Sequence, residues 1–218
     1  MNKINLKKEI LSIFIILISF IIGIYFYQHF PNKIAGHWGL SGQVDGYTSK
    51  EFGAFGIPGI MFGVWLLFLV LPFLDPKKDR YVEFDRAYNI FKTSFVILFF
   101  MLFISTGIYN LGYNINIGLI APILVGLFMI VLGNYLGKIK LNYFVGIKTP
   151  WTLSSETVWN KTHRLGGYAF ILFGILIMIS GFLPPILNAI AFILGISLII
   201  FVTFIYSYII YRKENSKK

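Results

Sequence analysis

The sequence predicts an all-α integral membrane protein with six transmembrane helices. Hydrophobic residues make up 57% of the 218 residues and charged residues only 13%, whereas a soluble domain carries about 25% charged residues. Six apolar runs are each long enough to cross a bilayer, which takes about 20 helical residues. The cations are unevenly distributed, because 17 of the 19 Lys and Arg residues fall on the two termini and on alternate connections, which predicts one orientation for the whole chain.

The six predicted spans follow one another with short breaks. In chain order they are Ile10–Tyr27, Phe52–Leu74, Thr93–Tyr109, Ile117–Leu136, Gly167–Leu183 and Ile186–Tyr211. Helices are expected because backbone groups in lipid must find their hydrogen bonds within the segment. The first run follows three lysines as a signal peptide would, but it is longer than a usual signal core and no A-x-A-like site follows it, so we expect an uncleaved span.

The cation distribution predicts that both termini lie in the cytosol. The two termini and the connections 75–92 and 137–166 hold the 17 cations, while the outer loop 30–51 holds only Lys33 and Lys50. We therefore expect a multi-pass membrane protein. The net charge of +10 suits lipid headgroups rather than nucleic acid, because the cations lie between apolar runs.

One polar segment, GIKTPWTLSSETVWNKTHRLGG at residues 146–167, stands out among the apolar runs. Residues 149–152 are expected to be extended or turning, because the residue before a proline avoids the helical region. Ser154 is a candidate N-cap, and Glu156 would suit the first turn of a helix. The sequence thus predicts a short cytosolic helix around 155–164, which Gly166 and Gly167 would end.

On this predicted helix Trp159 and His163 share one face, because they lie four residues apart. One interpretation places the face in the headgroup layer, where Trp is favoured, so that an interfacial helix anchors the connection. The other interpretation makes it a docking surface for a cytosolic partner.

The outer loop 30–51 carries its own candidates. His37 and Trp38 offer an aromatic surface beside a polar group, and Asp45-Gly46 is a turn signal. The loop is either a contact site for an extracellular ligand or an ordered, turn-rich loop whose Trp lies in the interfacial belt. His29, His37 and Asp45 would lie on the same side of the membrane, but their spacing fits no metal motif, so we expect no metal.

The spans argue against several activities. None of the six runs has an ionisable residue in its interior, which disfavours an ion-coupled transporter. The sequence contains no cysteine and no G-x-S-x-G, H-E-x-x-H or P-loop motif, so we expect neither an enzyme nor a cofactor. The connection 75–92 alternates acids and bases, as a solvated, self-paired linker does. Gly59-x-x-x-Gly63 and Gly133-x-x-x-Gly137 permit close helix packing, within one chain or between chains.

Two segments resemble a known family. FVGIKTPWTLSSETVWNKTHRLGG at 144–167 is similar to the signature segment of the SdpI family of bacterial immunity proteins, and FPNKIAGHWGLSGQVDGYTSK at 30–50 resembles its N-terminal DUF1648 region. Lys148 departs from the family pattern, where Arg is expected, and Lys cannot form the same bidentate contact. The resemblance divides the chain into a DUF1648-like region (1–74), a cytosolic linker (75–92) and an SdpI-like region (93–218).

The resemblance implies a protein of the bacterial cell membrane that protects the bacterium against a secreted toxic peptide. Some members also act as receptors that hold a cytosolic autorepressor, a small winged-helix protein, at the membrane. Protection without signalling remains an alternative, and so does a small uncoupled transporter or channel for a peptide or lipid. The candidate toxin-sensing residues are His37, Trp38, Gly42, Asp45 and Gly46; the candidate partner-docking residues are Gly146, Lys148, Thr149, Pro150, Trp151, Thr152, Glu156, Trp159, His163 and Arg164.

Overall fold

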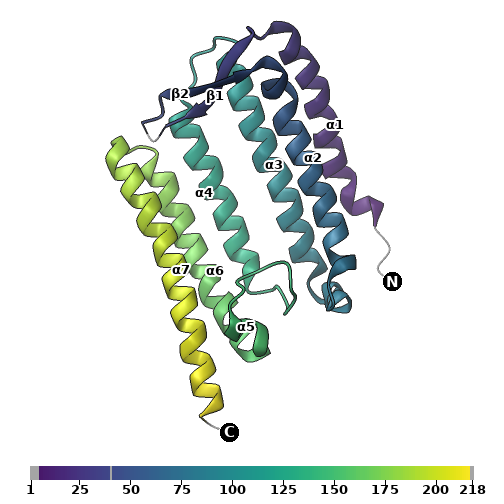
Figure 1. Ribbon diagram of the computed structural model, residues 1–218, viewed down its shortest axis with the longest axis vertical. Coiled ribbons are helices and arrows are strands. Elements are labelled where there is room, and N and C mark those ends of the chain that lie inside the picture. The colour runs from purple at the N-terminus through teal and green to yellow at the C-terminus, as the bar shows by residue number, and fades with distance from the viewer. Residues whose placement is uncertain (1–4, 40, 217–218) are drawn as a thin grey trace.

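The computed structural model describes residues 5–39 and 41–216, and six long helices dominate it (Figure 1). These helices are α1 (Leu6–His29), α2 (Lys50–Leu74), α3 (Asp85–Asn110), α4 (Ile117–Leu136), α6 (Glu156–Ser180) and α7 (Pro185–Asn215). Each belongs to a segment long and apolar enough to cross a membrane, which confirms the predicted all-α membrane fold. We call the end where α1 begins and α7 ends the termini end, and the opposite end the hairpin end (Figure 1).

The helices form a three-helix group and a row that extends from it. Helices α1, α2 and α3 pack against one another; α4 packs on α3 and on α6, and α6 packs on α7 (Figure 1). Contact between α3 and α4 therefore joins the N-terminal and C-terminal halves of the chain.

The predicted outer loop is a β-hairpin, which the sequence analysis did not foresee. Strands β1 (Lys33–Trp38) and β2 (Val44–Ser49) pair antiparallel. Gly42 has φ +73° in the turn between them, a conformation that glycine adopts without strain. Ser49 then caps α2 by accepting a hydrogen bond from the N–H of Phe52.

A proline inside α2 is compensated by a side chain from α3. Pro72 has no N–H, so the carbonyl of Phe68 lacks its usual helical partner. The hydroxyl of Tyr88 donates to this carbonyl at 2.6 Å. The proline therefore fixes the contact between α2 and α3 near the termini end.

Four glycines bring α4 and α6 into backbone contact. A Cβ added at Gly174 would lie 2.5 Å from the carbonyl oxygen of Gly126, and one added at Gly167 would lie 2.7 Å from that of Gly133. Such close approach is typical of small residues at membrane helix interfaces. Gly133 thus packs within the chain, whereas a Cβ added at Gly59 or Gly63 would meet nothing within 4 Å.

Replacing Gly174 with Ala should destabilise the protein, because backbone atoms cannot move away cheaply from the new methyl group. We expect a cost of about 1–3 kcal/mol from overpacking, measured as a lower unfolding temperature in detergent. Gly63→Ala is the matched control, since its Cβ would point into open space. Equal unfolding temperatures for the two variants would contradict the glycine packing of α4 on α6.

Two predicted helix boundaries are wrong. The helix expected at 155–164 does not end at Gly166 and Gly167; it is the beginning of α6, which continues to Ser180. Both glycines are buried against neighbouring helices, so they serve packing rather than termination. Helix α3 begins at Asp85 rather than near Thr93.

The connection after α2 is also more ordered than a solvated linker. It contains a 3-10 helix, η1 (Lys78–Phe84), whose Tyr81 and Phe84 are buried. The expected self-pairing is present between Arg80 and Glu83, at 3.1 Å. Aromatic side chains therefore hold this connection against the helices.

Candidate functional site

The predicted site residues lie at opposite ends of the bundle. The signature segment is at the termini end and the β-hairpin is at the hairpin end (Figure 1). The two groups therefore form separate candidate sites. At the termini end, helix α5 (Pro150–Ser154) precedes α6.

Asn142 organises the connection between α4 and α5. Its side chain is fully buried; Oδ1 accepts hydrogen bonds from the N–H groups of Phe144 and Val145, and Nδ2 donates to the carbonyls of Lys140 and Val145. An amide can satisfy donors and acceptors together, so one side chain holds the whole turn. The sequence analysis did not select Asn142, because a single polar residue in a connection carries no local signal.

Asp75 joins the two halves of the chain at this end. It is 1% exposed and caps the end of α2. Its Oδ2 accepts from the hydroxyl of Tyr81 at 3.0 Å and from the N–H of Tyr143 at 2.9 Å. The charged acceptor thus ties α2 and η1 to the segment that Asn142 orders.

Trp159 and His163 are both fully buried and stack with ring centroids 4.0 Å apart. The indole Nε1 donates to the carbonyl of Ile139 at 2.8 Å. The face predicted to meet headgroups or a partner therefore points into the protein, because α6 packs it against the 137–149 connection. Both of our interpretations of that face are wrong.

Hydrogen bonding also defines the tautomer of His163. The N–H of Ile147 is a donor, so Nε2 at 2.9 Å must be an unprotonated acceptor. The carbonyl of Trp159 is an acceptor, so Nδ1 at 2.8 Å carries the proton. His163 is thus a neutral bridge between α6 and the signature connection.

Gly146 fits closely over this stack. It has φ +124°, and an added Cβ would collide with Nε2 of His163 and lie 3.0 Å from the ring of Trp159. Both the backbone conformation and the space require glycine. Gly146 is therefore a structural position of the signature segment.

A capping box begins helix α5, which we had expected to be extended or turning. Oγ1 of Thr149 accepts from the N–H of Thr152 at 3.1 Å, and Oγ1 of Thr152 accepts from the N–H of Thr149 at 2.8 Å. Pro150 occupies the first helical position, where its missing N–H costs nothing. Thr149 alone is extended, as the following proline requires.

Helix α5 is held against α7. Thr149 donates through Oγ1 to Oγ of Ser207 at 3.1 Å. The ring of Trp151 meets Phe204 edge-on at 4.8 Å and lies 5.1 Å from Tyr208. Trp151 is thus half-buried between α5 and α7.

Ser155, rather than the expected Ser154, is the N-cap of α6. It accepts from the N–H of Val158 and donates to Glu214 of α7 at 2.6 Å. The next residue, Glu156, pairs with Arg80 of η1 at 2.5 Å. The start of α6 is therefore connected to both halves of the chain.

The remaining signature residues are exposed. Lys148 donates to the carbonyls of Tyr143 and Phe144, while Pro150 and Arg164 face outward. Along α6, Thr157, Lys161 and Arg164 lie on one exposed face. We call these three residues the signature face.

At the hairpin end, His37 and Asp45 face each other across the strands. Nδ1 of His37 lies 2.5 Å from Oδ1 of Asp45, and both side chains are more than half exposed. Gly46 opposes His37, and a Cβ there would lie 2.9 Å from the Cβ of His37. Tyr47, which we did not predict, is 69% exposed beside them.

The other hairpin residues contact the helices. Trp38 packs edge-on against Tyr109 of α3 with centroids 5.4 Å apart. A Cβ added at Gly42 would lie 3.1 Å from the Cα of Gly118 in α4. Trp38 and Gly42 therefore dock the hairpin on the bundle, and its exposed surface includes His37, Asp45 and Tyr47. Among the described residues, no group of three or more acids and histidines could hold a metal ion.

The side chain of Asn110 anchors the hairpin to α3. It accepts from the N–H of Ala35 at 2.8 Å and donates to the carbonyl of Ala35 at 3.0 Å, as a neighbouring strand would. Asn110→Ala should leave both groups unpaired and raise amide exchange at Ala35 by about tenfold or more, since an unmade buried hydrogen bond costs about 1–3 kcal/mol. Hydrogen exchange measured by mass spectrometry checks this. Asn134→Ala is the control, because its side chain bonds only within α4; unchanged exchange in Asn110→Ala would contradict the anchoring role.

Six apolar helices, with polar connections ordered at one end and a hairpin at the other, define a multi-pass membrane protein. Residues 138–210 match the SdpI/YfhL protein family, and residues 14–62 match DUF1648, a domain of unknown function. The chain is 31% identical over 213 residues to the immunity protein SdpI of Bacillus subtilis (strain 168), covering 98% of this chain and 100% of that protein. The chain belongs to the SdpI family. No solved structure matches it.

Proposed function

We propose that this protein is a membrane immunity protein that protects the bacterium producing it against a secreted toxic peptide. The observation that carries the proposal is the near full-length similarity to the immunity protein SdpI. The six apolar helices place the chain where a membrane-active peptide acts. No element of the proposal requires the chain to be an enzyme.

The test is expression in a toxin-sensitive strain, with the Bacillus subtilis relative as the positive control and an empty vector as the negative one. The added peptide is the toxin against which the relative protects. We expect cells that express the chain to grow in its presence. The proposal would be contradicted if the chain inserts normally into the membrane but the cells do not grow at any peptide concentration that the relative tolerates.

We further propose that the termini end faces the cytosol and that the chain divides into a DUF1648-like region (1–74), the connection 75–92 and an SdpI-like region (93–218). The orientation is supported by the cation excess at that end. The division is supported by two separate family matches, at residues 14–62 and 138–210.

Single cysteines test the orientation directly, because the natural chain has none. Tyr47→Cys and Lys161→Cys each replace an exposed residue, one at each end of the bundle. In intact cells a membrane-impermeant maleimide should label Tyr47→Cys, and it should label Lys161→Cys only after permeabilisation. The reverse pattern would invert the proposed orientation.

A receptor role would use the signature face, because Trp159 and His163 are buried. Lys161 and Arg164, both exposed, make this face cationic. A small winged-helix repressor would dock here from the cytosol when the toxic peptide engages the hairpin end.

Charge reversal at this face tests the receptor role. Lys161→Glu with Arg164→Glu should abolish recruitment of a fluorescently tagged winged-helix repressor encoded beside the protein, while protection persists. Lys213→Glu is the control, because it changes the charge of an exposed residue at the end of α7. Recruitment that survives the double reversal would place the docking surface elsewhere.

A further inference from the structure

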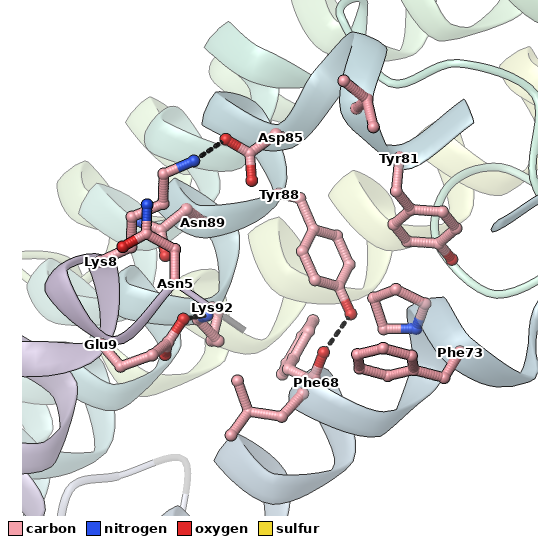
Figure 2. A pocket seen from close by; sticks show the side chains of 13 residues that line it. Asn5, Lys8, Glu9, Phe68, Phe73, Tyr81, Asp85, Tyr88, Asn89 and Lys92 are labelled. Carbon is pink, nitrogen blue, oxygen red and sulfur yellow. Dashed lines mark hydrogen bonds and ion pairs between the residues drawn. The ribbon is translucent and has the colours of Figure 1, made fainter. Parts of the chain in front are cut away.

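A pocket of about 540 Å³ opens between α1, α2, η1 and α3 at the termini end (Figure 2). Its volume lies within the range of small-molecule sites. The signature face belongs to α6, which does not line the pocket. Neither the toxin-sensing hairpin nor the docking face uses it.

The pocket has two unlike walls. Figure 2 shows Lys8, Glu9, Asn89 and Lys92 gathered on one side, with Phe68, Phe73 and Tyr81 across from them. The aromatic side chains of α2 and η1 thus face the charged side chains of α1 and α3. A ligand that fits both walls is an amphiphile.

The charges of the polar wall are balanced. Lys92 and Glu9 form an ion pair that is almost fully buried. Lys8 pairs with Asp85, and both of these side chains are partly exposed at 41% and 49%. A ligand that inserts between Lys8 and Asp85 must replace both partners of this pair, which a zwitterion does and a net anion does not.

The polar wall also contains an unpaired hydrogen-bond acceptor that a ligand could satisfy. Oδ1 of Asn89 is buried without a hydrogen-bond partner among the described residues, and Asn89 lines the pocket. A ligand that reaches this oxygen gains affinity by bringing an N–H or O–H group, because an unpaired buried acceptor is costly. A quaternary ammonium group has no such donor.

The surroundings of the opening indicate that the ligand comes from the bilayer. Phe73 in the last turn of α2 is 48% exposed, and Val82 of η1 is 65% exposed; both line the pocket. Apolar side chains exposed beside ionised ones are characteristic of the boundary between hydrocarbon and headgroups. Acyl chains can lie against the exposed apolar side chains while a headgroup enters.

We propose that this pocket binds the headgroup of a zwitterionic phospholipid that carries a donor ammonium, as phosphatidylethanolamine does. The phosphate lies toward Lys8, and the ammonium lies toward Asp85 and Oδ1 of Asn89. The proposal does not depend on the immunity function.

Thermal unfolding in detergent with added lipids of identical acyl chains tests the proposal. Phosphatidylethanolamine should bind about tenfold more tightly than phosphatidylcholine, which lacks the donor, and more tightly than the anionic phosphatidylglycerol. Native mass spectrometry of the same samples should show one preferred lipid adduct. Equal retention of all three lipids, or retention of none, would overturn the proposal.

Two variants give the test a specific signature. Asp85→Asn leaves Lys8 as an unpaired cation, so the preference should change from phosphatidylethanolamine to phosphatidylglycerol. Asn89→Leu should remove the discrimination against phosphatidylcholine. Asp79→Asn is the matched control: it makes the same charge change at an exposed residue of η1 that does not line the pocket. A preference altered equally by Asp79→Asn and Asp85→Asn would assign selectivity to net charge and overturn the assignment to the pocket.

Discussion

Replacing Lys92 with Met should lower the free energy of unfolding by about 3–5 kcal/mol, because it would leave Glu9 buried without its counter-charge. Glu9 and Lys92 are each 4% exposed and form an ion pair between α1 and α3. Nε1 of Trp65 in α2 donates to the second carboxylate oxygen at 3.0 Å. One carboxylate thus joins all three helices of the N-terminal group, and a single neutralisation affects each contact.

Unfolding in detergent, followed by intrinsic fluorescence, measures this effect. The double variant Glu9→Gln with Lys92→Met should recover most of the lost stability, because an amide keeps the bond to Trp65 and carries no charge. Lys8→Met is the control: it breaks the Lys8–Asp85 pair, whose side chains are partly exposed, and exposed pairs contribute only about 0–1 kcal/mol. A loss in Lys92→Met no larger than that in Lys8→Met would show that Glu9 is not left uncompensated.

Replacing Gly146 with Ala should cost at least about 2 kcal/mol. Alanine at φ +124° is strained by about 1–3 kcal/mol, and its Cβ would enter the space taken by His163 and Trp159. Overpacking a close-packed site adds about 1–3 kcal/mol. The neighbouring hydrogen bond from Ile147 to His163 would be displaced, so the signature connection should also become sensitive to protease.

Gly137→Ala is the matched control for this variant. Gly137 has φ −66° at the end of α4, and a Cβ there would lie an ordinary 3.6 Å from the Cα of Arg164. Thermal unfolding and limited proteolysis should therefore distinguish two glycines that lie nine positions apart in one connection. If Gly146→Ala unfolds at the same temperature as Gly137→Ala, the stack does not constrain this position.

The sequence predicted local features of the candidate sites, such as a shared helix face, but not what that face contacts. Thr149 and Pro150 carry a local capping signal, although we interpreted it as a turn and placed the next cap one residue early, at Ser154 instead of Ser155. The spacing of Trp159 and His163 correctly predicted a shared face and a helix. It did not predict whether that face meets lipid, a partner or the protein itself, because an aromatic pair at this spacing suits all three environments.

Two glycines also show that a local sequence signal can be overridden by tertiary packing. Gly166 and Gly167 resemble a helix stop, yet α6 continues through them because α4 packs directly against the bare backbone. In water two glycines would weaken the helix by about 1 kcal/mol each. In lipid the close contact and the absence of other backbone partners favour continuing the helix.

The sequence by itself determined the six membrane-spanning segments, because each segment of about 20 residues partitions into the bilayer according to its own hydropathy. It also determined the family, through motifs that are contiguous in the chain. The tertiary structure alone decided the pairing of Glu9 with Lys92, the bonding of Asp75 to Tyr143 and the burial of the Trp159–His163 stack. The first two contacts join residues far apart in the chain and all three depend on how the helices rotate against their neighbours, and side-chain packing sets that rotation.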